Sequence, residues 1–326
     1  MDTNAILRLL EYKDSPFFLE GPRLREYAGF SHIFRRAEEF CRLRGVYTLK
    51  EQSAEALANQ SVVPLVYVCE AEDEHQAAEI HKLVWNQNIV PFLLVVTPYR
   101  FSLYRGFAYE HRTATEVDSI KDQSILQAAK EATEILRKFS DFKAQSIDNG
   151  IIFQNWSEHI KPNTRVDWKL LDSLKKLGKQ LISDPPTLLR NIAHTLIGKY
   201  VYLRYLRDRG ILSDRKFAEW GLNYEEVFSR NATLSGLYSV EKKLENWLNG
   251  SVFPLPKEGT FKRAHVRKVA STFQGDEPVS GQMHLGFPAY NFAYIPIETL
   301  SVVYEQFLHA EGQGRKKGAY YLYCLV

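Results

Sequence analysis

A cluster of acidic residues follows the first long apolar run of the sequence. Glu70, Glu72 and Asp73 come directly after "VVPLVYVC", whose length and β-branched content predict a buried strand. Carboxylates at the carboxyl end of a strand are a common way to hold Mg²⁺ in two-metal nucleases. Lys82, in the helix predicted next, could supply the positive charge of such a site. One hypothesis is therefore a Mg²⁺-dependent DNA nuclease with Glu70 and Glu72 as metal ligands and Lys82 as the positive group.

These acids also have a structural interpretation. A nuclease of the PD-(D/E)xK type presents Glu-x-Lys on this strand and an aspartate on the preceding one. Here the triplet is Glu70, Ala71 and Glu72, and no convincing upstream aspartate is present. Acidic residues at the start of a helix accept hydrogen bonds from its first N–H groups and complement its dipole. Capping of the helix predicted over 72–88 is the simpler explanation, and any nuclease-like domain here would be degenerate.

Two arginines on one helix face are candidates for contacts with DNA phosphates. In "YLRYLRDRG", Arg204 and Arg207 lie three residues apart, and Asp208 stands four residues after Arg204. A guanidinium group suits phosphate, but it needs a groove to point into. The alternative is an ion pair within the helix on a solvated face.

The last basic cluster of the chain is followed by two tyrosines. Arg315, Lys316 and Lys317 could neutralise phosphates, and Tyr320 and Tyr321 could stack on bases or on a ligand ring. A basic terminus without a ligand is the alternative, and composition does not separate the two.

Composition places the chain among cytoplasmic proteins and excludes several classes. The net charge is only +3, from 42 basic and 39 acidic residues, so attraction to nucleic acid must come from local clusters. Cys41, Cys69 and Cys324 are too widely spaced for a zinc ribbon or a disulfide framework, and we assign no metal site from the sequence. No Walker loop, Gly-x-Gly-x-x-Gly or Gly-x-Ser-x-Gly motif is present. The longest apolar run, 89–96, is too short to span a bilayer, so no membrane association is expected.

The first part of the chain predicts an α/β domain with a small mixed sheet. Two apolar runs flank the amphipathic helix over 72–88, which is typical of a βαβ unit. A third run alternates Phe101, Leu103 and, less regularly, Arg105, which predicts a half-exposed strand. An amphipathic helix is expected earlier, with Ser31 as its N-cap and Gly45 as its stop. The predicted segments are a helix over 31–44 and strands over 62–71, 89–98 and 99–109.

From Ser119 onward the pattern becomes mainly helical. Apolar residues recur with the 3.6-residue helical period, and lysines lie on the outer faces. The expected helices cover 124–142, 167–182, a segment from Pro185 to a stop at Gly210, a short stretch at 265–271, and a segment that begins at Pro296. We therefore expect three parts: 1–117, an α/β nuclease-like domain; 118–275, a helical connector domain; and 276–326, a helical lead-in to a further domain.

Four phrases in the second half occur in an order that resembles a known family. They are "LIGKYVYLRYLRDRGIL", "WLNGSVFPLP", "YNFAYIPIETLSVVYEQFL" and "GRKKGAYY". Together they resemble the region just before the catalytic domain of adenine-N6 DNA methyltransferases of the restriction-modification kind, including single-chain enzymes that join nuclease and methylase and type I modification subunits. The earlier segment 80–107 also looks like the amino-terminal region of some of these proteins.

The resemblance implies a DNA-binding and scaffolding segment without methyl transfer of its own. In the family, the last phrase continues as Thr-Pro into the S-adenosylmethionine fold, so Tyr320 and Tyr321 would lie near the cofactor entrance. Here Leu322–Val326 follow instead, and neither a glycine-rich cofactor motif nor Asn-Pro-Pro-Tyr is present. We expect truncation before the catalytic domain and no cofactor in this chain. The expected partners are DNA and a separate methyltransferase or specificity subunit, and the other class left open is a non-catalytic regulatory subunit.

Overall fold

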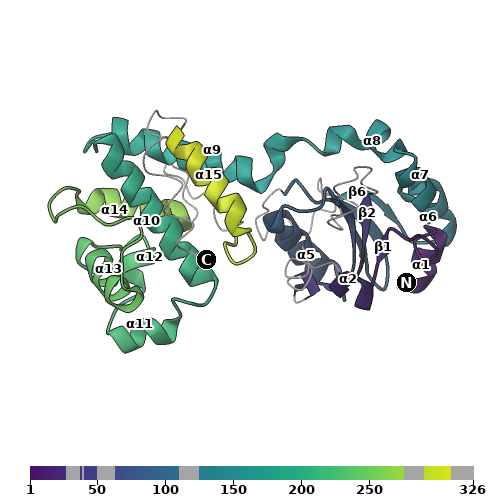
Figure 1. The fold of residues 1–326 in the computed structure, drawn as a ribbon, viewed down its shortest axis with the longest axis horizontal. Coiled ribbons are helices and arrows are strands. Elements are labelled where there is room, and N and C mark those ends of the chain that lie inside the picture. Colours follow the sequence, from purple (N-terminus) through teal and green to yellow (C-terminus); the bar gives the residue numbers. More distant parts are fainter. Residues whose placement is uncertain (27–36, 39, 50–62, 110–124, 275–289, 310–326) are drawn as a thin grey trace. The chain divides into compact units, whose positions relative to one another are not determined.

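The chain folds into two compact units. A computed structural model describes residues 1–26, 37–38, 40–49, 63–109, 125–274 and 290–309 (Figure 1). Unit 1 comprises Met1–Glu110 and Ala114–Val166, and unit 2 comprises His111–Thr113 and Asp167–Val326. Unit 1 holds a β-sheet, and the described part of unit 2 is helical, so the expected order of an α/β part followed by a mainly helical part is confirmed.

Unit 1 is built on a six-stranded mixed sheet whose spatial order is β1-β2-β3-β4-β5-β6. Only β3 and β4 are parallel, and the helix α5 (Glu74–Gln87) makes the crossover between them. The other neighbours are antiparallel. The strands are β1 (Phe18–Leu19), β2 (Arg42–Leu49), β3 (Val63–Glu70), β4 (Phe92–Val96), β5 (Phe101–Arg105) and β6 (Ile125–Ala129).

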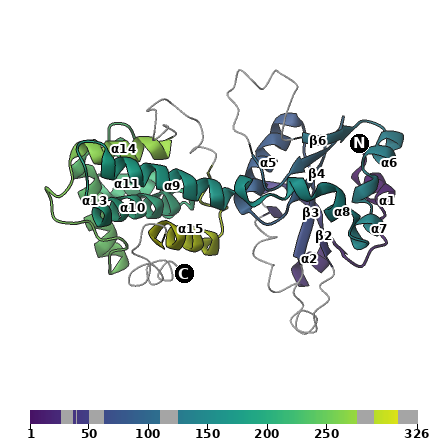
Figure 2. The same ribbon diagram turned by 90° about the horizontal axis from the view of Figure 1, so that it is seen from above.

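Helices cover both faces of this sheet (Figures 1 and 2). Side chains alternate between the faces of a strand, so Val66 and Val68 point to one core while Tyr67 and Cys69 point to the other. The helices α5 and α2 (Pro22–Glu26) pack on the Tyr67 side. Four others contribute to the core on the Val66 side: α1 (Thr3–Leu9), α6 (Ala132–Lys138), α7 (Ala144–Asp148) and α8 (Ile151–Trp156).

The predicted βαβ unit is confirmed, but the strand after it is more buried than expected. β3, α5 and β4 lie where the two apolar runs and the helical period placed them. In β5 only Arg105 is partly exposed, and the four residues before it are buried. The strand lies between β4 and β6, with core on both faces, which explains why the half-exposed interpretation was wrong.

The helix predicted over 31–44 does not extend to its expected end. Residues 31–36 and 39 lie outside the described residues, and 42–44 belong to β2. Gly45 is therefore not a helix stop. A Cβ atom on it would stand 2.3 Å from Cζ of Phe18, so glycine allows this ring to lie directly against β2. Glycine is needed at this position because of Phe18 in the neighbouring strand. The sequence around Gly45 does not show this contact, so the prediction of a helix stop was wrong.

The division between the units lies further along the chain than 117. The segment 124–142 was expected to be helical throughout, yet Ile125–Ala129 forms β6, antiparallel to β5. Next, α6, α7 and α8 contribute Ile135, Ile147 and Ile152 to the core on the sheet. Unit 1 thus extends to Val166 because these residues bury the sheet face. The expected boundary after 275 falls outside the described residues.

In unit 2 the expected long helices are confirmed with adjusted ends. The N–H of Leu188 donates to the carbonyl of Leu181 at the end of α9, so the chain turns back and α10 begins at Arg190 instead of at Pro185. Gly210 adopts a φ of 73° just after α10, as a helix stop requires. The helices are α9 (Val166–Ser183), α10 (Arg190–Asp208), α11 (Asp214–Trp220), α12 (Glu225–Phe228), α13 (Leu234–Leu248), α14 (Arg263–Gln274) and α15 (Ile297–His309).

Candidate functional site

The acidic cluster after β3 includes the cap of α5. Asp73 is the N-cap residue, and its carboxylate accepts a hydrogen bond from the N–H of Gln76 over 2.8 Å. The side chain of Gln76 in turn accepts from the N–H of Glu72 over 2.7 Å. The capping interpretation is therefore confirmed for Asp73.

We expect the replacement Asp73→Ala to lower the free energy of unfolding by about 1 kcal/mol, because it removes the side-chain acceptor from the first turn of α5. Urea unfolding followed by circular dichroism measures the change. Glu79→Ala, at an exposed position in the middle of the same helix, is the matched control and should change stability by less than about 0.5 kcal/mol. Equal stabilities of the two variants would contradict the capping role.

Glu70 and Glu72 contact arginines of the neighbouring strand. Nε of Arg44 lies 3.7 Å from Oε1 of Glu70, which also accepts a hydrogen bond from the hydroxyl of Thr3. Glu72 pairs with Arg42, and both of these side chains are largely exposed. A metal-dependent nuclease would need an aspartate on this neighbouring strand, but β2 places two cations beside the glutamates.

Lys82 lies at a distance from this cluster. It stands eight residues after Glu74 on α5, which corresponds to about 12 Å along the helix axis. Within the described ranges, no group of three or more histidine, cysteine, aspartate or glutamate residues is placed to hold a metal ion. The nuclease hypothesis with Glu70, Glu72 and Lys82 stays a prediction that this geometry does not favour.

Two cysteines that are distant in the sequence meet in unit 1. The Sγ atoms of Cys41 and Cys69 lie 2.8 Å apart, and both residues are buried free thiols. Burial raises the pKa of Cys69, and the hydrogen bond and charge of Cys41 add to the effect. Sequence spacing alone did not reveal this pair, because it forms where Cys41 precedes β2 and Cys69 lies near the end of the adjacent β3.

The two arginines at the end of α10 have partners inside unit 2. Nε of Arg204 lies 2.9 Å from Oδ1 of Asp208, which confirms the expected ion pair within the helix. Arg207 pairs with Asp214 and donates to the carbonyl of Leu212 over 3.0 Å. Their expected contact with DNA stays a prediction. The other expected contacts with DNA or cofactor, by Arg315, Lys316, Lys317, Tyr320 and Tyr321, lie outside the described residues.

Three of the four phrases that carry the family resemblance pack against one another in unit 2. The first phrase covers the second half of α10 and the residues just after it, the second begins in the last turn of α13, and the third covers all of α15 except its last residue. We call their meeting point, with its partner from α13, the helical junction. It consists of Gly198 and Lys199 on α10, Glu241 on α13, Ser251 and Phe253 after α13, and Tyr304 on α15.

Gly198 lets two aromatic residues approach α10 closely. A Cβ atom at this position would lie 2.6 Å from the hydroxyl of Tyr304 and 2.9 Å from the ring of Phe253. The rings of Phe253 and Tyr304 pack with centroids 4.8 Å apart. The hydroxyl of Tyr304 also donates to the carbonyl of His194 over 3.4 Å. One glycine thus brings all three phrases together.

A buried ion pair ties α10 to α13 and to the segment that follows it. The side chain of Lys199 is 1% exposed, and its ammonium group pairs with the carboxylate of Glu241. Ser251 donates to Oε1 of Glu241 and accepts from Lys199 over 3.4 Å. Burial lowers the pKa of Lys199, and the charge of Glu241 acts against this effect. Because the pair is nearly excluded from water, each charge depends on the other.

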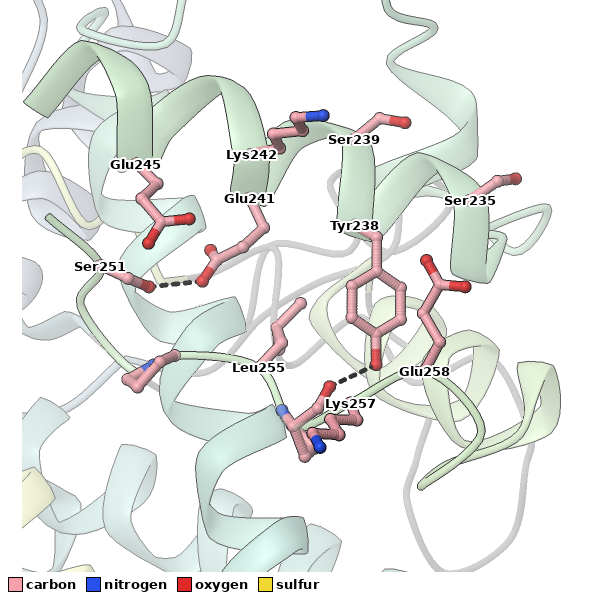
Figure 3. A pocket seen from close by; sticks show the side chains of 12 residues that line it. Ser235, Tyr238, Ser239, Glu241, Lys242, Glu245, Ser251, Leu255, Lys257 and Glu258 are labelled. Carbon is pink, nitrogen blue, oxygen red and sulfur yellow. Dashed lines mark hydrogen bonds between the residues drawn. The ribbon is translucent and has the colours of Figure 1, made fainter.

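The ion pair borders an open pocket of about 630 Å³ (Figure 3). Glu241 and Ser251 line it and are joined by a hydrogen bond, and the hydroxyl of Tyr238, which also lines it, donates to the carbonyl of Pro256 over 2.7 Å. The charged side chains around it carry both signs, so the pocket shows no preference for anions or cations. The other lining residues are Ser235, Ser239, Lys242, Glu245, Pro254, Leu255, Lys257 and Glu258.

A second set of contacts joins the far end of α10 to the third phrase. Oδ2 of Asp208 accepts a hydrogen bond from the N–H of Phe292 over 3.0 Å. Arg209 donates to the carbonyl of Ile295 over 3.4 Å, just before α15 begins. The chain that enters α15 is thus fixed on α10. These contacts position the helices of unit 2. Sequence reasoning missed Lys199 and Glu241 because they lie 42 residues apart in the chain.

Comparisons with known proteins found no match: neither a family model, nor a curated protein, nor a solved structure resembles this chain significantly. Among the described residues, no helix is both long enough and apolar enough to cross a membrane.

Proposed function

We propose that this chain is the DNA-binding and scaffolding amino-terminal segment of an adenine-N6 DNA methyltransferase of the restriction-modification kind. The observation that carries the proposal is the helical junction. Three phrases that resemble the family, in the family's order, are also in mutual contact, through Gly198, Phe253 and Tyr304. Segments that keep a family pattern are expected to share a packed core, and contacts among them support a common origin.

The scaffolding role follows from the position of α15. This helix is the last described element, and the phrase "GRKKGAYY" follows it in the sequence. In the family, that phrase leads into the domain that binds S-adenosylmethionine. Tyr304 of the junction holds α15 on α10, and the hydrogen bond between Asp208 and Phe292 fixes the segment before α15 to the far end of α10. In this proposal, α15 presents the following basic phrase to DNA and to a methyltransferase or specificity subunit that holds the cofactor.

DNA contact is assigned to the basic residues after α15. Arg204 and Arg207 contribute less in this account, because each already has an acidic partner in unit 2. A nuclease in unit 1 has weaker support, because Glu70 and Glu72 pair with arginines of β2. The sequence-independent part of DNA affinity comes from lysines and arginines that replace condensed counterions on the phosphates.

The triple replacement of Arg315, Lys316 and Lys317 by alanine is expected to make DNA binding less salt-dependent. Each lost phosphate contact changes the slope of log K against log[salt] by about 0.9, so the slope should fall by about 3 in magnitude. Fluorescence anisotropy with a labelled duplex at several salt concentrations measures it.

The matched control removes three exposed lysines elsewhere in unit 2, at Lys169, Lys179 and Lys243. It should keep the wild-type slope, because these residues lie outside the phrase assigned to DNA. If the triple variant of 315–317 binds with the same slope as the wild type while the control loses slope, DNA contact is made by the helical surface and the assignment to the basic phrase is wrong.

A further inference from the structure

Unit 1 contains a small cavity with several basic side chains. Its volume is about 160 Å³, and it is lined by Arg105, Glu158, His159, Lys161 and Thr164. Arg105 is the last residue of β5, and the other four belong to the segment between α8 and α9. None of the sites expected from the sequence includes this cavity.

The backbone around Arg105 is held in place, but part of its guanidinium group is not satisfied. Arg105 pairs with Phe92 in the sheet, and its carbonyl accepts from Nε2 of His81 over 2.8 Å. Its Nε atom is buried and has no hydrogen-bond partner among the described residues. Burial of an unsatisfied donor destabilises the folded protein, and such a group calls for an explanation. An anion in the adjacent cavity would provide the missing acceptor.

The segment that carries the other lining residues is held in place by contacts with two tryptophans, Trp156 and Trp85. His159 ends a short 3-10 turn and packs on Trp156 with ring centroids 5.3 Å apart. Thr164 donates to the carbonyl of Lys161 over 3.0 Å, and the indole of Trp85 donates to the carbonyl of Thr164 over 3.1 Å. The segment therefore holds His159 and Lys161 beside the strand end without a ligand.

The charges of the cavity favour an anion. Arg105 and Lys161 are cations, His159 becomes one on protonation, and Glu158 is the one acid among the lining residues. Burial lowers the pKa of His159, the charges of Arg105 and Lys161 lower it further, and Glu158 acts the other way. A bound anion would offset these cations and favour the imidazolium form.

We propose that this cavity, which we name the phosphate pocket, binds one phosphate group through Arg105, His159 and Lys161. Guanidinium and ammonium groups are the usual donors to phosphate oxygens. The volume of about 160 Å³ is below the roughly 300–1,000 Å³ of sites that enclose drug-sized ligands. The pocket therefore takes a single phosphate group, either as a free ion or as the phosphate of a nucleotide or DNA strand that extends outside.

Titration of the whole chain with inorganic phosphate tests the proposal. The ring resonances of His159, followed by NMR, are expected to shift with saturation, and the pKa of its imidazole should rise in the bound state. Lys161→Ala should weaken binding about 3- to 10-fold, and Arg105→Gln about 10- to 100-fold, as expected for charge-assisted hydrogen bonds. Arg137→Ala removes an exposed charge of unit 1 outside the pocket and should leave binding unchanged.

Two further arms identify the source of the phosphate group and protect the test against misfolding. If duplex DNA displaces inorganic phosphate, the pocket binds a phosphate group of the DNA backbone. If only a mononucleotide displaces it, the pocket binds a free phosphate compound.

A second variant keeps the test valid if Arg105→Gln fails to fold. Arg105→Lys keeps the charge and should still weaken binding, because lysine lacks the fork geometry of the guanidinium group. Absence of a saturable shift of His159, or equal affinity in the wild type and in Lys161→Ala and the Arg105 variant, would overturn the proposal. The basic phrase 315–317 plays no part in this titration, so its result is independent of the proposed DNA contact.

Discussion

Replacement of Lys199 by methionine is expected to lower the free energy of unfolding of unit 2 by about 3–5 kcal/mol. Methionine keeps most of the volume of lysine but removes the charge that compensates Glu241. The carboxylate would remain inside unit 2 with Ser251 as its remaining hydrogen-bond donor at the junction. Guanidinium chloride unfolding of the whole chain, followed by tryptophan fluorescence, measures the loss.

Two control variants test whether the loss of stability comes from the buried, unpaired charge and not from the loss of a lysine as such. Lys176→Met breaks an exposed i,i+4 pair with Asp172 on α9 and should cost less than about 1 kcal/mol. The double variant Lys199→Met with Glu241→Leu removes both buried charges and should recover most of the stability. If Lys199→Met costs no more than Lys176→Met, the ion pair does not stabilise the helical junction.

Replacement of Gly198 by alanine is expected to destabilise unit 2 by about 1–3 kcal/mol. Alanine favours a helix by about 1 kcal/mol over glycine, so a position free of contacts would become more stable. Here the added Cβ would meet the ring of Phe253 at 2.9 Å and the hydroxyl of Tyr304 at 2.6 Å. Thermal unfolding gives the change in stability, and NMR chemical shifts of the two aromatic rings report their displacement.

Gly178 is the matched control, because it is a helical glycine of unit 2 in a less crowded place. A Cβ atom there would come no closer than 3.3 Å to the ring of Phe307. Gly178→Ala should therefore cost clearly less than Gly198→Ala, or stabilise α9. The close packing at Gly198 would be contradicted if both variants gained stability equally, as helix propensity alone predicts.

The central part of unit 1 could be predicted from the sequence because its signals are local. Two short apolar runs rich in β-branched residues flank a segment with the helical period, and the structure has β3, α5 and β4 at these places. The cap at Asp73 was also visible, since an acidic residue preceded the first helical turn. Each of these features depends on neighbours within a few residues.

Other elements depend on contacts that sequence patterns do not show. Residues 125–129 lie in a stretch with helical composition, yet they form a strand because β5 offers them a free edge. Gly45 looked like a helix end, but its role is set by Phe18 of the adjacent β1. Tertiary contact overrode local propensity in both cases.

The candidate sites also differ in whether local sequence patterns could reveal them. The pair of Arg204 and Asp208 follows from helical spacing and was expected. By contrast, Lys199 and Glu241 of the helical junction are far apart in the sequence, and so are Arg105 and His159 of the phosphate pocket. Only the fold brings these side chains together, so no spacing rule could have found them.

The salt dependence of DNA binding by the unaltered chain tests the proposed function most directly. Three to five phosphate contacts, from the basic phrase and the arginines of α10, predict a slope of log K against log[salt] between about −2.7 and −4.5. Anisotropy titrations of a duplex over a series of salt concentrations give this slope. A steep linear dependence in this range is the predicted result. Absence of binding, or an affinity that does not change with salt, would contradict the assignment of this chain to DNA.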